Sequence, residues 1–183
     1  MVVPADVTDG KVMESTVAEV EAKLGPIDIL VNAAGTIMPP GRTWEADPDL
    51  WWRVVETNLK GTVNTCRAAA RRMCARRRGR IINVASSTVL HGRPNMSAYV
   101  ASKAAVVKLT EVLAAELAAF GVTAFVIHPG TVRTEMSELL LRPENAPLVP
   151  WFKKIFDERR DNQMCIRDRT GAGGGAAGCA SSG

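Results

Sequence analysis

The stretch Arg80-Ile-Ile-Asn-Val-Ala-Ser-Ser87 decides the fold class, because it joins an apolar, β-branched run directly to a Ser-rich loop. An Ala-rich helical stretch follows from Ser97 to Phe120, and Gly121 ends it. A second apolar run, Val122 to Ile127, ends at His128-Pro-Gly130. Short strands that are apolar throughout are typical of a parallel sheet buried on both faces, and a helix between two such strands predicts a right-handed βαβ unit.

The same alternation of strand and helix extends toward the N-terminus. Val2-Val3 is a short β-like run that ends at Asp6. Residues 9–24 predict a helix with one face at a spacing of four, and that face holds Val12, Thr16, Val20 and Leu24. Residues 27–31, of sequence IDILV, predict another strand, which runs into Asn32-Ala-Ala-Gly35.

The remaining elements complete the alternation. A loop is expected over residues 36–48, a long helix from about Leu50 to Arg78 that ends before Gly79, and a last helical piece at about 150–160. Together they predict one α/β domain over residues 1–161: a doubly wound parallel sheet, three-layered and Rossmann-like, incomplete at both ends. Residues 162–183 finish with the stretch GAGGGAAGCASSG, which is mostly Gly and Ala, so this tail is expected to be disordered or foreign to the domain.

Composition excludes several classes of protein. The 183 residues are 46% hydrophobic and 23% charged, which is typical of a globular domain. No run of about 18 apolar residues predicts a membrane span, and no secretory leader is evident at the start. The four Cys show no metal-ligand spacing, so no metal site is expected, and free thiols in a reducing cytoplasm are the default.

The net charge of +4 comes from one segment. Residues 67–80 hold seven Arg and no acidic residue, which leaves 16 − 19 = −3 for the rest of the chain. These Arg side chains stand at the C-terminus of a predicted helix, where the helix dipole favours cations. No aromatic residue interleaves them, so a solvated helix end is favoured over a nucleic-acid site. A role as an RNA-binding or scaffold protein through these Arg side chains remains an alternative.

Tyr99-Val-Ala-Ser-Lys103 is the sharpest local signal for chemistry. The spacing i, i+4 puts Tyr99 and Lys103 on one helical face, and Tyr99 is the only Tyr in the chain. A free phenol has a pKa of about 10, and lowering it by about three units requires about 4 kcal/mol of differential stabilisation. A dry site with a fixed cation could supply much of that energy.

Further motifs accompany this pair in a fixed order. Ser86 stands at a strand end before Tyr99, at the spacing i, i+13, and Asn58 stands before Ser86 at the spacing i, i+28. With Asn32-Ala-Ala-Gly35 and Pro129-Gly-Thr-Val-Arg-Thr134, these residues resemble the short-chain dehydrogenase/reductase family, in the subgroup with an Asn-Ser-Tyr-Lys tetrad. The resemblance covers roughly residues 2–161.

The resemblance implies roles for the tetrad. Tyr99 is expected to be the general acid/base between an alcohol and a carbonyl, and Ser86 to position the substrate oxygen. Lys103 is expected to lower the Tyr99 pKa and hold the nicotinamide ribose. Asn58 is expected to interrupt its helix and anchor a water that relays protons through Lys103. Ser87 has an alternative claim on the role of Ser86, which the spacing to Tyr99 disfavours.

The resemblance also implies a cofactor, NAD or NADP, and a small-molecule alcohol or carbonyl substrate, with no nucleic acid or membrane partner. The matching cofactor-binding positions, besides Tyr99 and Lys103, are Asp6, Val7, Asn32, Ala33, Gly35, Pro129, Gly130, Val132 and Thr134. Asn32 and Asn58 could instead satisfy buried backbone groups or cap turns. Residues 135–160 are expected to form a lid, with Thr88, Leu90 and Met96 facing the substrate. A homodimer or homotetramer is a further expectation from the family.

The family's Gly-rich phosphate-binding turn finds no match in this sequence. The residue that selects NAD or NADP is missing with it. The chain by itself is therefore expected to show no saturable binding of nicotinamide cofactors at micromolar concentration. A catalytically silent nucleotide-sensing protein on the same fold is the alternative to an enzyme, and the presence of Tyr99 and Lys103 favours the enzyme.

Overall fold

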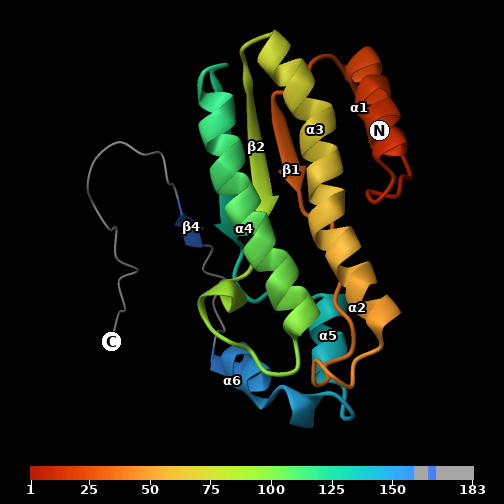
Figure 1. Ribbon diagram of the computed structural model, residues 1–183, viewed down its shortest axis with the longest axis vertical. Coiled ribbons are helices and arrows are strands. Elements are labelled where there is room, and N and C mark those ends of the chain that lie inside the picture. The colour runs from red at the N-terminus through yellow and green to blue at the C-terminus, as the bar shows by residue number, and fades with distance from the viewer. Residues whose placement is uncertain (159–164, 168–183) are drawn as a thin grey trace, which may run out of the picture.

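The computed structural model of the chain describes residues 1–158 and 165–167 (Figure 1). In chain order the elements are α1 Gly10–Leu24, β1 Ile29–Asn32, α2 Pro48–Val55, a π-helical segment Glu56–Lys60, α3 Gly61–Ala75, β2 Gly79–Val84, α4 Ser97–Ala118, β3 Val122–His128, α5 Glu135–Leu141, α6 Pro150–Glu158 and β4 Cys165–Arg167. Two 3₁₀ turns, Ser87–Leu90 and Ala146–Leu148, complete the path. Most of the predicted tail lies outside the described residues.

A parallel sheet organises these elements, as the sequence predicted. The strand order is β1-β2-β3-β4, in which β1, β2 and β3 run parallel and β4 pairs antiparallel with β3. In this register Asn32 lies opposite Asn83 at the carboxyl ends of β1 and β2. The residues that follow these two strands therefore meet at the same edge of the sheet.

Helices α3 and α4 pack on the sheet, and α1 packs on the outer side of α3 (Figure 1). The core between them contains Cys66, Ala69, Met73, Ile81, Leu117 and Val122. Ile81 and Asn83 of β2 point into this core and are fully buried. Burial of this apolar interface between two layers is the main source of the domain's stability.

The sheet is not buried on both faces along its whole width. In β1, Ile29 is 56% exposed and Val31 is 53% exposed, whereas Asn32 is buried. Within the described residues β1 is an outer strand, and α3 covers only the face that carries Leu30 and Asn32. The expectation of strands buried on both sides is therefore wrong for β1.

Two expectations for the N-terminal segment that ends at Leu24 are also wrong. Val2-Val3 forms no strand, because no described strand lies beside it to complete a ladder of hydrogen bonds. Helix α1 buries Met13 and Val17, not the predicted face, and Leu24 is 68% exposed. Steps of four residues drift by about 40° each around a helix of 3.6 residues per turn, so the predicted stripe winds away from α3.

The long helix predicted to Arg78 ends earlier, at Ala75. Arg77 adopts a left-handed φ of 54°, and the Arg78 N–H donates to the Met73 carbonyl at 3.1 Å. The chain then enters β2 at Gly79, where an added Cβ would overlap the Met73 side chain. Only glycine permits this close approach of β2 to α3.

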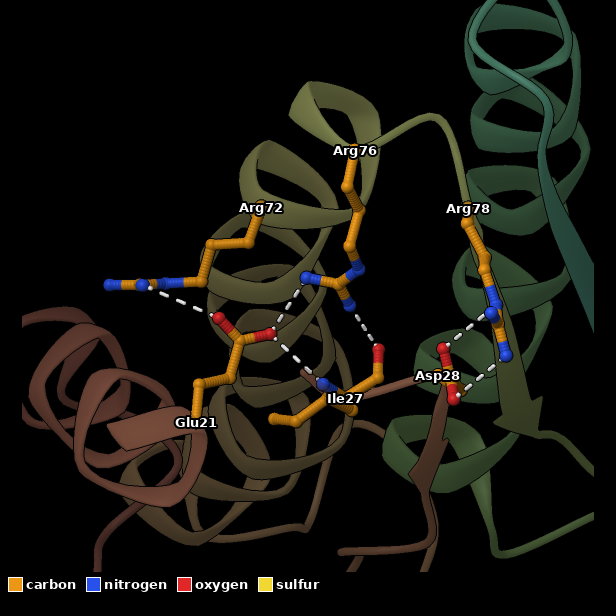
Figure 2. Close-up of polar contacts among 6 residues, drawn as sticks. All are labelled: Glu21, Ile27, Asp28, Arg72, Arg76 and Arg78. Atoms are coloured by element: carbon orange, nitrogen blue, oxygen red, sulfur yellow. Dashed lines mark hydrogen bonds and ion pairs between the residues drawn. The ribbon is translucent and has the colours of Figure 1, made fainter. Parts of the chain in front are cut away.

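The Arg-rich segment forms a network of ion pairs at the amino ends of β1 and β2 (Figure 2). Arg76 contacts Glu21 at 2.8 Å and also donates to the Ile27 carbonyl, and the Ile27 N–H donates to Glu21 at 3.0 Å. Arg72 contacts the other Glu21 oxygen at 3.4 Å. Burial alone would raise the pKa of Glu21, but these hydrogen bonds and cations outweigh it and lower that pKa.

Other Arg side chains of the same segment are also engaged within the protein. Arg78 contacts Asp28 at 3.1 Å, and Arg77 donates to the Ala119 carbonyl at 3.0 Å. Arg80 lies over the Phe125 ring, with 5.5 Å between its guanidinium carbon and the ring centroid. The expectation of a simply solvated helix end is therefore wrong for Arg76, since its guanidinium joins α3 to α1 and to the start of β1.

Candidate active site

Ser86 and Tyr99 meet at the carboxyl end of β2. Ser86 caps the 3₁₀ turn Ser87–Leu90, and its Oγ accepts hydrogen bonds from the Thr88 N–H at 3.3 Å and the Thr88 hydroxyl at 3.0 Å. Tyr99 stands in the first turn of α4, and its phenol hydrogen-bonds the Ser86 side chain. The two hydroxyls that the sequence motif singled out are therefore direct neighbours.

Lys103 lies one turn further along α4 and is 4% exposed. Its Nζ donates to the Val84 carbonyl at 2.9 Å and lies 5.9 Å from the centroid of the Tyr99 ring. Burial lowers the pKa of Lys103 to about 8. Among the described residues no carboxylate forms an ion pair with this ammonium.

The Tyr99 pKa differs from the sequence-based expectation. Burial raises it above the ordinary value for a phenol, and the hydrogen bond from Ser86 offsets only part of the increase. The Lys103 ammonium donates to the Val84 carbonyl and lies beside the ring, and only the Ser86 hydroxyl lowers the Tyr99 pKa. The expected lowering of the Tyr99 pKa is therefore not found in this arrangement, which keeps the phenol protonated.

Asn58 is fully buried within the π-helical segment that separates α2 from α3. Its Nδ2 donates to the Thr36 carbonyl at 3.0 Å and to Ser102 Oγ at 2.9 Å, and its Oδ1 accepts from the Thr36 N–H at 2.7 Å. The Ser102 hydroxyl in turn donates to the Tyr99 carbonyl at 2.8 Å. Asn58 thus ties the loop after β1 to the helix that carries Tyr99, and π-helical segments of this kind recur at functional sites.

Gly35 stands between these buried groups. A Cβ added to it would lie 3.2 Å from Asn58 Oδ1 and 3.4 Å from Lys103 Nζ. Any side chain at this position would therefore press on both. The absence of one leaves the backbone of the loop close to the Lys103 ammonium, which is a suitable arrangement for a ligand that must approach both.

An apolar cover packs over Tyr99. Met96, Leu140 and Val149 are buried together, and Ile37, Tyr99, Val100, Trp151 and Phe152 pack against them. Asn95, with φ of 67°, donates through Nδ2 to the Leu148 carbonyl at 2.7 Å, which joins the loop before α4 to the segment between α5 and α6. The segment predicted as a lid thus packs on α4, the helix that carries Tyr99, and Met96 of the candidate substrate-facing residues belongs to this cover.

The predicted cofactor-binding residues fall into two groups, and the first group lies on the segments that follow β1 and β3. Ala33 is exposed and follows β1, and Pro129 and Gly130 follow β3, with Gly130 at a φ of 85°. Val132 is exposed, and Thr134 caps α5, where its hydroxyl accepts from the Ser137 N–H at 3.4 Å. All of them lie at the carboxyl end of the sheet, at the same edge as Tyr99.

The second group is engaged with the protein itself. The Asn32 amide donates to Asn83 at 2.8 Å and to the Cys66 sulfur at 3.1 Å, and its Oδ1 accepts from the Thr65 hydroxyl at 2.6 Å. Its side chain therefore lies in the layer between sheet and helices, and only its backbone faces the strand end. Burial raises the pKa of the Cys66 thiol to about 11.

Asp6 and Val7 lie beside the start of α1. The Thr8 N–H and hydroxyl hydrogen-bond the Asp6 carboxylate at 2.8 and 2.9 Å and lower its pKa. Val7 Cγ2 would lie 2.5 Å from a Cβ added to Gly61, so the first turn of α3 closely approaches this loop.

Two residues that the sequence-based prediction missed hold the site together. Thr36 and Ser102 satisfy the Asn58 amide, and Ser102 also reaches the Tyr99 carbonyl. Ser102 could have been found, because it stands directly before Lys103 in the Tyr-Val-Ala-Ser-Lys motif. No sequence signal marks Thr36, which acts through its backbone.

Comparison with known proteins places this arrangement in context. The sequence model of the family described as "short chain dehydrogenase" matches residues 1–145. A curated relative, 2,3-dihydro-2,3-dihydroxybenzoate dehydrogenase of Bacillus subtilis (strain 168), is 37% identical over 142 residues, which are 78% of this chain and 54% of the relative.

Solved structures show the same likeness. A gluconate 5-dehydrogenase from Burkholderia cenocepacia J2315, in complex with NADP and tartrate, superimposes with a TM-score of 0.72 at 35% identity and covers 77% of this chain and 55% of that one. An NAD⁺-bound xylitol dehydrogenase superimposes with a TM-score of 0.69 at 31% identity, over 74% of this chain and 53% of that one. The chain thus spans about half the length of these relatives. Among the described residues, no helix is both long and apolar enough to cross a membrane.

Proposed function

The chain belongs to the short-chain dehydrogenase family, and from that premise we propose that it interconverts an alcohol and a carbonyl by hydride transfer with NAD or NADP. The observation that carries the proposal is the contact between the Tyr99 phenol and the Ser86 hydroxyl, with the Lys103 ammonium beside the ring. The family membership supports the reaction class, and the relatives in complex with NADP and NAD⁺ support the cofactor.

The residues at the carboxyl edge of the sheet fit a nicotinamide cofactor. Lys103 offers an ammonium without a carboxylate partner among the described residues, and Gly35 lets the loop backbone approach it closely. Lys103 and Tyr99 would hold the nicotinamide ribose, with Ala33, Gly130, Val132 and Thr134 along the same edge. When bound, the nicotinamide ring gives or accepts the hydride.

Tyr99 and Ser86 handle the proton and the substrate oxygen. The Ser86 hydroxyl donates to the carbonyl oxygen and orients it, and the Tyr99 phenol delivers its proton to that oxygen. Burial raises the pKa of Tyr99, so the phenol holds its proton until the substrate oxygen takes it. In alcohol oxidation the same phenol must first lose its proton, so oxidation is expected to accelerate as the pH rises.

Lys103 and Asn58 support this proton transfer. With the phenol protonated, only the Ser86 hydroxyl lowers the Tyr99 pKa. Once the proton has left, the Lys103 ammonium beside the ring is the cation positioned to attract the phenolate. Asn58 holds the Thr36 loop against α4 through Ser102 and so fixes the distance between loop and catalytic helix. A water anchored near Asn58 that relays protons through Lys103 is part of this proposal. The cytoplasm as compartment and a homodimer or homotetramer as assembly remain predictions.

Substitution of the tetrad tests the proposal. The rate of nicotinamide oxidation or reduction is measured by its ultraviolet absorbance on the full chain, with millimolar NAD or NADP and with xylitol or gluconate as probe substrates. Tyr99→Phe removes the transferred proton and is expected to lower the rate by about 10²- to 10⁴-fold. Ser86→Ala is expected to lower it as well, whereas the matched neighbour Ser87→Ala keeps it.

Two results would contradict the proposal. If Tyr99→Phe retains the rate of the unmodified chain, the phenol is not the acid. If Ser87→Ala loses the rate and Ser86→Ala keeps it, the substrate oxygen lies at the other hydroxyl. Saturable cofactor binding without any turnover in the unmodified chain would favour the nucleotide-sensing alternative.

A further inference from the structure

Two buried donors beside the catalytic helix have no hydrogen-bond partner among the described residues. They are Nε of Arg93, on the loop between Ser86 and Tyr99, and Nε1 of Trp151, at the start of α6. The Arg93 guanidinium carbon lies 4.6 Å from the centroid of the Trp151 ring, so the two side chains are stacked. Proteins pair nearly all buried donors of this kind, and each exception calls for a specific explanation.

The stacked pair borders the cover over Tyr99. Trp151 packs on the buried cluster of Met96, Leu140 and Val149, and Tyr99 packs on the same cluster. Met96, Leu140 and Val149 are themselves buried, so a small molecule whose reacting carbon lies at the Tyr99 phenol would meet the half-buried side chains around them, Ile37, Val100 and Phe152, with the Arg93–Trp151 pair at the border. The two unpaired donors belong to the two segments that would enclose such a molecule, the catalytic loop and α6.

The charge of Arg93 is also unbalanced. Among the described residues no carboxylate forms an ion pair with it. Arg42 provides the comparison, because its guanidinium also lies over a Trp ring, that of Trp44, at 5.8 Å, yet it contacts Glu45 at 3.2 Å. A partly buried guanidinium with an unpaired N–H is a strong binding group for a carboxylate.

We infer that Arg93, together with Trp151 Nε1, binds the carboxylate of an amphipathic substrate whose apolar body packs on the half-buried side chains Ile37, Val100 and Phe152. The inference rests on the proposed function, since it places the substrate's reacting carbon at Tyr99, and it adds the substrate class. The carboxylate accepts from Arg93 Nε and from the Trp151 indole and so pairs both orphan donors. Because both atoms are buried in this structure, α6 must move aside for the ligand to enter. A neutral analogue of this substrate lacks the negative charge and forms weaker hydrogen bonds with Arg93 Nε and Trp151 Nε1.

Binding can be measured without cofactor or turnover. The probe is benzoate, an aromatic carboxylate, titrated into the full chain while NMR follows the N–H signals of the four Trp indoles. Trp151→Phe identifies the Trp151 signal by its loss. Benzoate is expected to shift that signal saturably and to leave the Trp44 signal unmoved, whereas benzamide, its neutral isostere, shifts neither at the same concentration.

Substitutions then separate recognition from structure. Arg93→Gln is expected to weaken benzoate binding by about tenfold or more, because the charged half of the interaction is lost. Arg42→Gln, which disrupts the other Arg–Trp stack, leaves binding unchanged. Equal shifts of the Trp44 and Trp151 signals, an equal response to benzamide, or unchanged affinity in Arg93→Gln each overturn the inference.

The result of the benzoate titration does not depend on whether the catalytic proposal is correct. Tyr99→Phe is expected to retain benzoate binding while losing turnover. If benzoate binds through Arg93 but Tyr99→Phe still turns over substrate, the proposed mechanism fails and the carboxylate site stands. If Tyr99→Phe loses turnover but benzoate does not move the Trp151 signal, the mechanism stands and the carboxylate site fails.

Discussion

At the amino ends of β1 and β2, the partly buried Arg76 guanidinium contacts Glu21 at 2.8 Å and the Ile27 carbonyl (Figure 2). At the carboxyl ends, the buried Lys103 ammonium contacts the Val84 carbonyl at 2.9 Å and, among the described residues, no carboxylate. A carboxylate neutralises Arg76 within the folded protein, whereas none of the described carboxylates neutralises Lys103. The difference indicates that one end of the sheet is built for stability, and that the other holds an ammonium at a cost in stability, which is typical of a functional site.

The largest expected effect on stability comes from Lys103→Met. A pKa lowered from 10.5 to about 8 means that burying the Lys103 ammonium costs about 3 kcal/mol of stability below pH 8. Lys103→Met removes this cost but also removes the hydrogen bond to the Val84 carbonyl, which contributes about 1 kcal/mol. At neutral pH the variant should therefore be more stable by about 2 kcal/mol in urea unfolding, although it loses activity.

The sign of this effect can be checked with pH. A lowered folded-state pKa adds stability that is present above the unfolded value of 10.5 and lost as the pH falls through about 8. The difference between Lys103→Met and the unmodified chain should therefore shrink as the pH rises across that window. If Lys103→Met is less stable than the unmodified chain at neutral pH, or if their difference in stability does not depend on pH, burial of the ammonium does not cost stability.

A smaller, opposite effect is expected at the other end of the sheet. Glu21→Ala leaves Arg72 and Arg76 without their carboxylate and should destabilise the protein by about 1.5 kcal/mol, since the Glu21 side chain is 15% exposed and Arg76 is 22% exposed. The matched control is Glu19→Ala, whose exposed pair with Lys23 on the same helix should contribute below about 0.5 kcal/mol. Equal effects of the two substitutions on urea unfolding would contradict the contrast between the two ends.

The smallest effect concerns the Tyr99 pKa. Tyr99 is the only Tyr, so the ultraviolet absorbance of tyrosinate reports on this one phenol. Its pKa should lie above that of the unfolded chain, because burial raises it, and Ser86→Ala should raise it further by removing the hydrogen bond from Ser86. The stability linked to Tyr99 is present below the unfolded pKa and is lost as the pH rises through the folded one. A native pKa below the unfolded value would contradict this structure of the site.

Periodicity and spacing predicted the local framework of the molecule. The strands at Gly79–Val84 and Val122–His128 and the helix Ser97–Ala118 closely follow the predicted bounds, because each apolar run ends at a Gly or Ser-rich turn. The contact between Tyr99 and Ser86 was implied by the family motif and agrees with the observed neighbours. These features depend on residues close together in the chain or on motifs of fixed spacing.

Other features depend on which surface each element meets. The buried face of α1 is set by α3, and Val2-Val3 has no neighbouring strand among the described residues, so neither could be predicted from a local pattern. The Tyr99 pKa follows from burial and from the place where Lys103 finds its hydrogen bond. The orphan donors of Arg93 and Trp151 exist only because α6 folds back onto the loop between Ser86 and Tyr99.

By itself, the sequence determined the order of the main helices and strands from Gly10 to His128, the parallel sheet and the chemical groups at its carboxyl edge, since these follow from residue type and spacing along one chain. The tertiary structure decided which charges meet an opposite charge within the protein and which meet none among the described residues. Glu21 and Arg76 are far apart in sequence, and so are Arg93 and Trp151. Pairing and stacking between such side chains are set by packing in three dimensions, where burial, and not sequence distance, determines the energy of a charge.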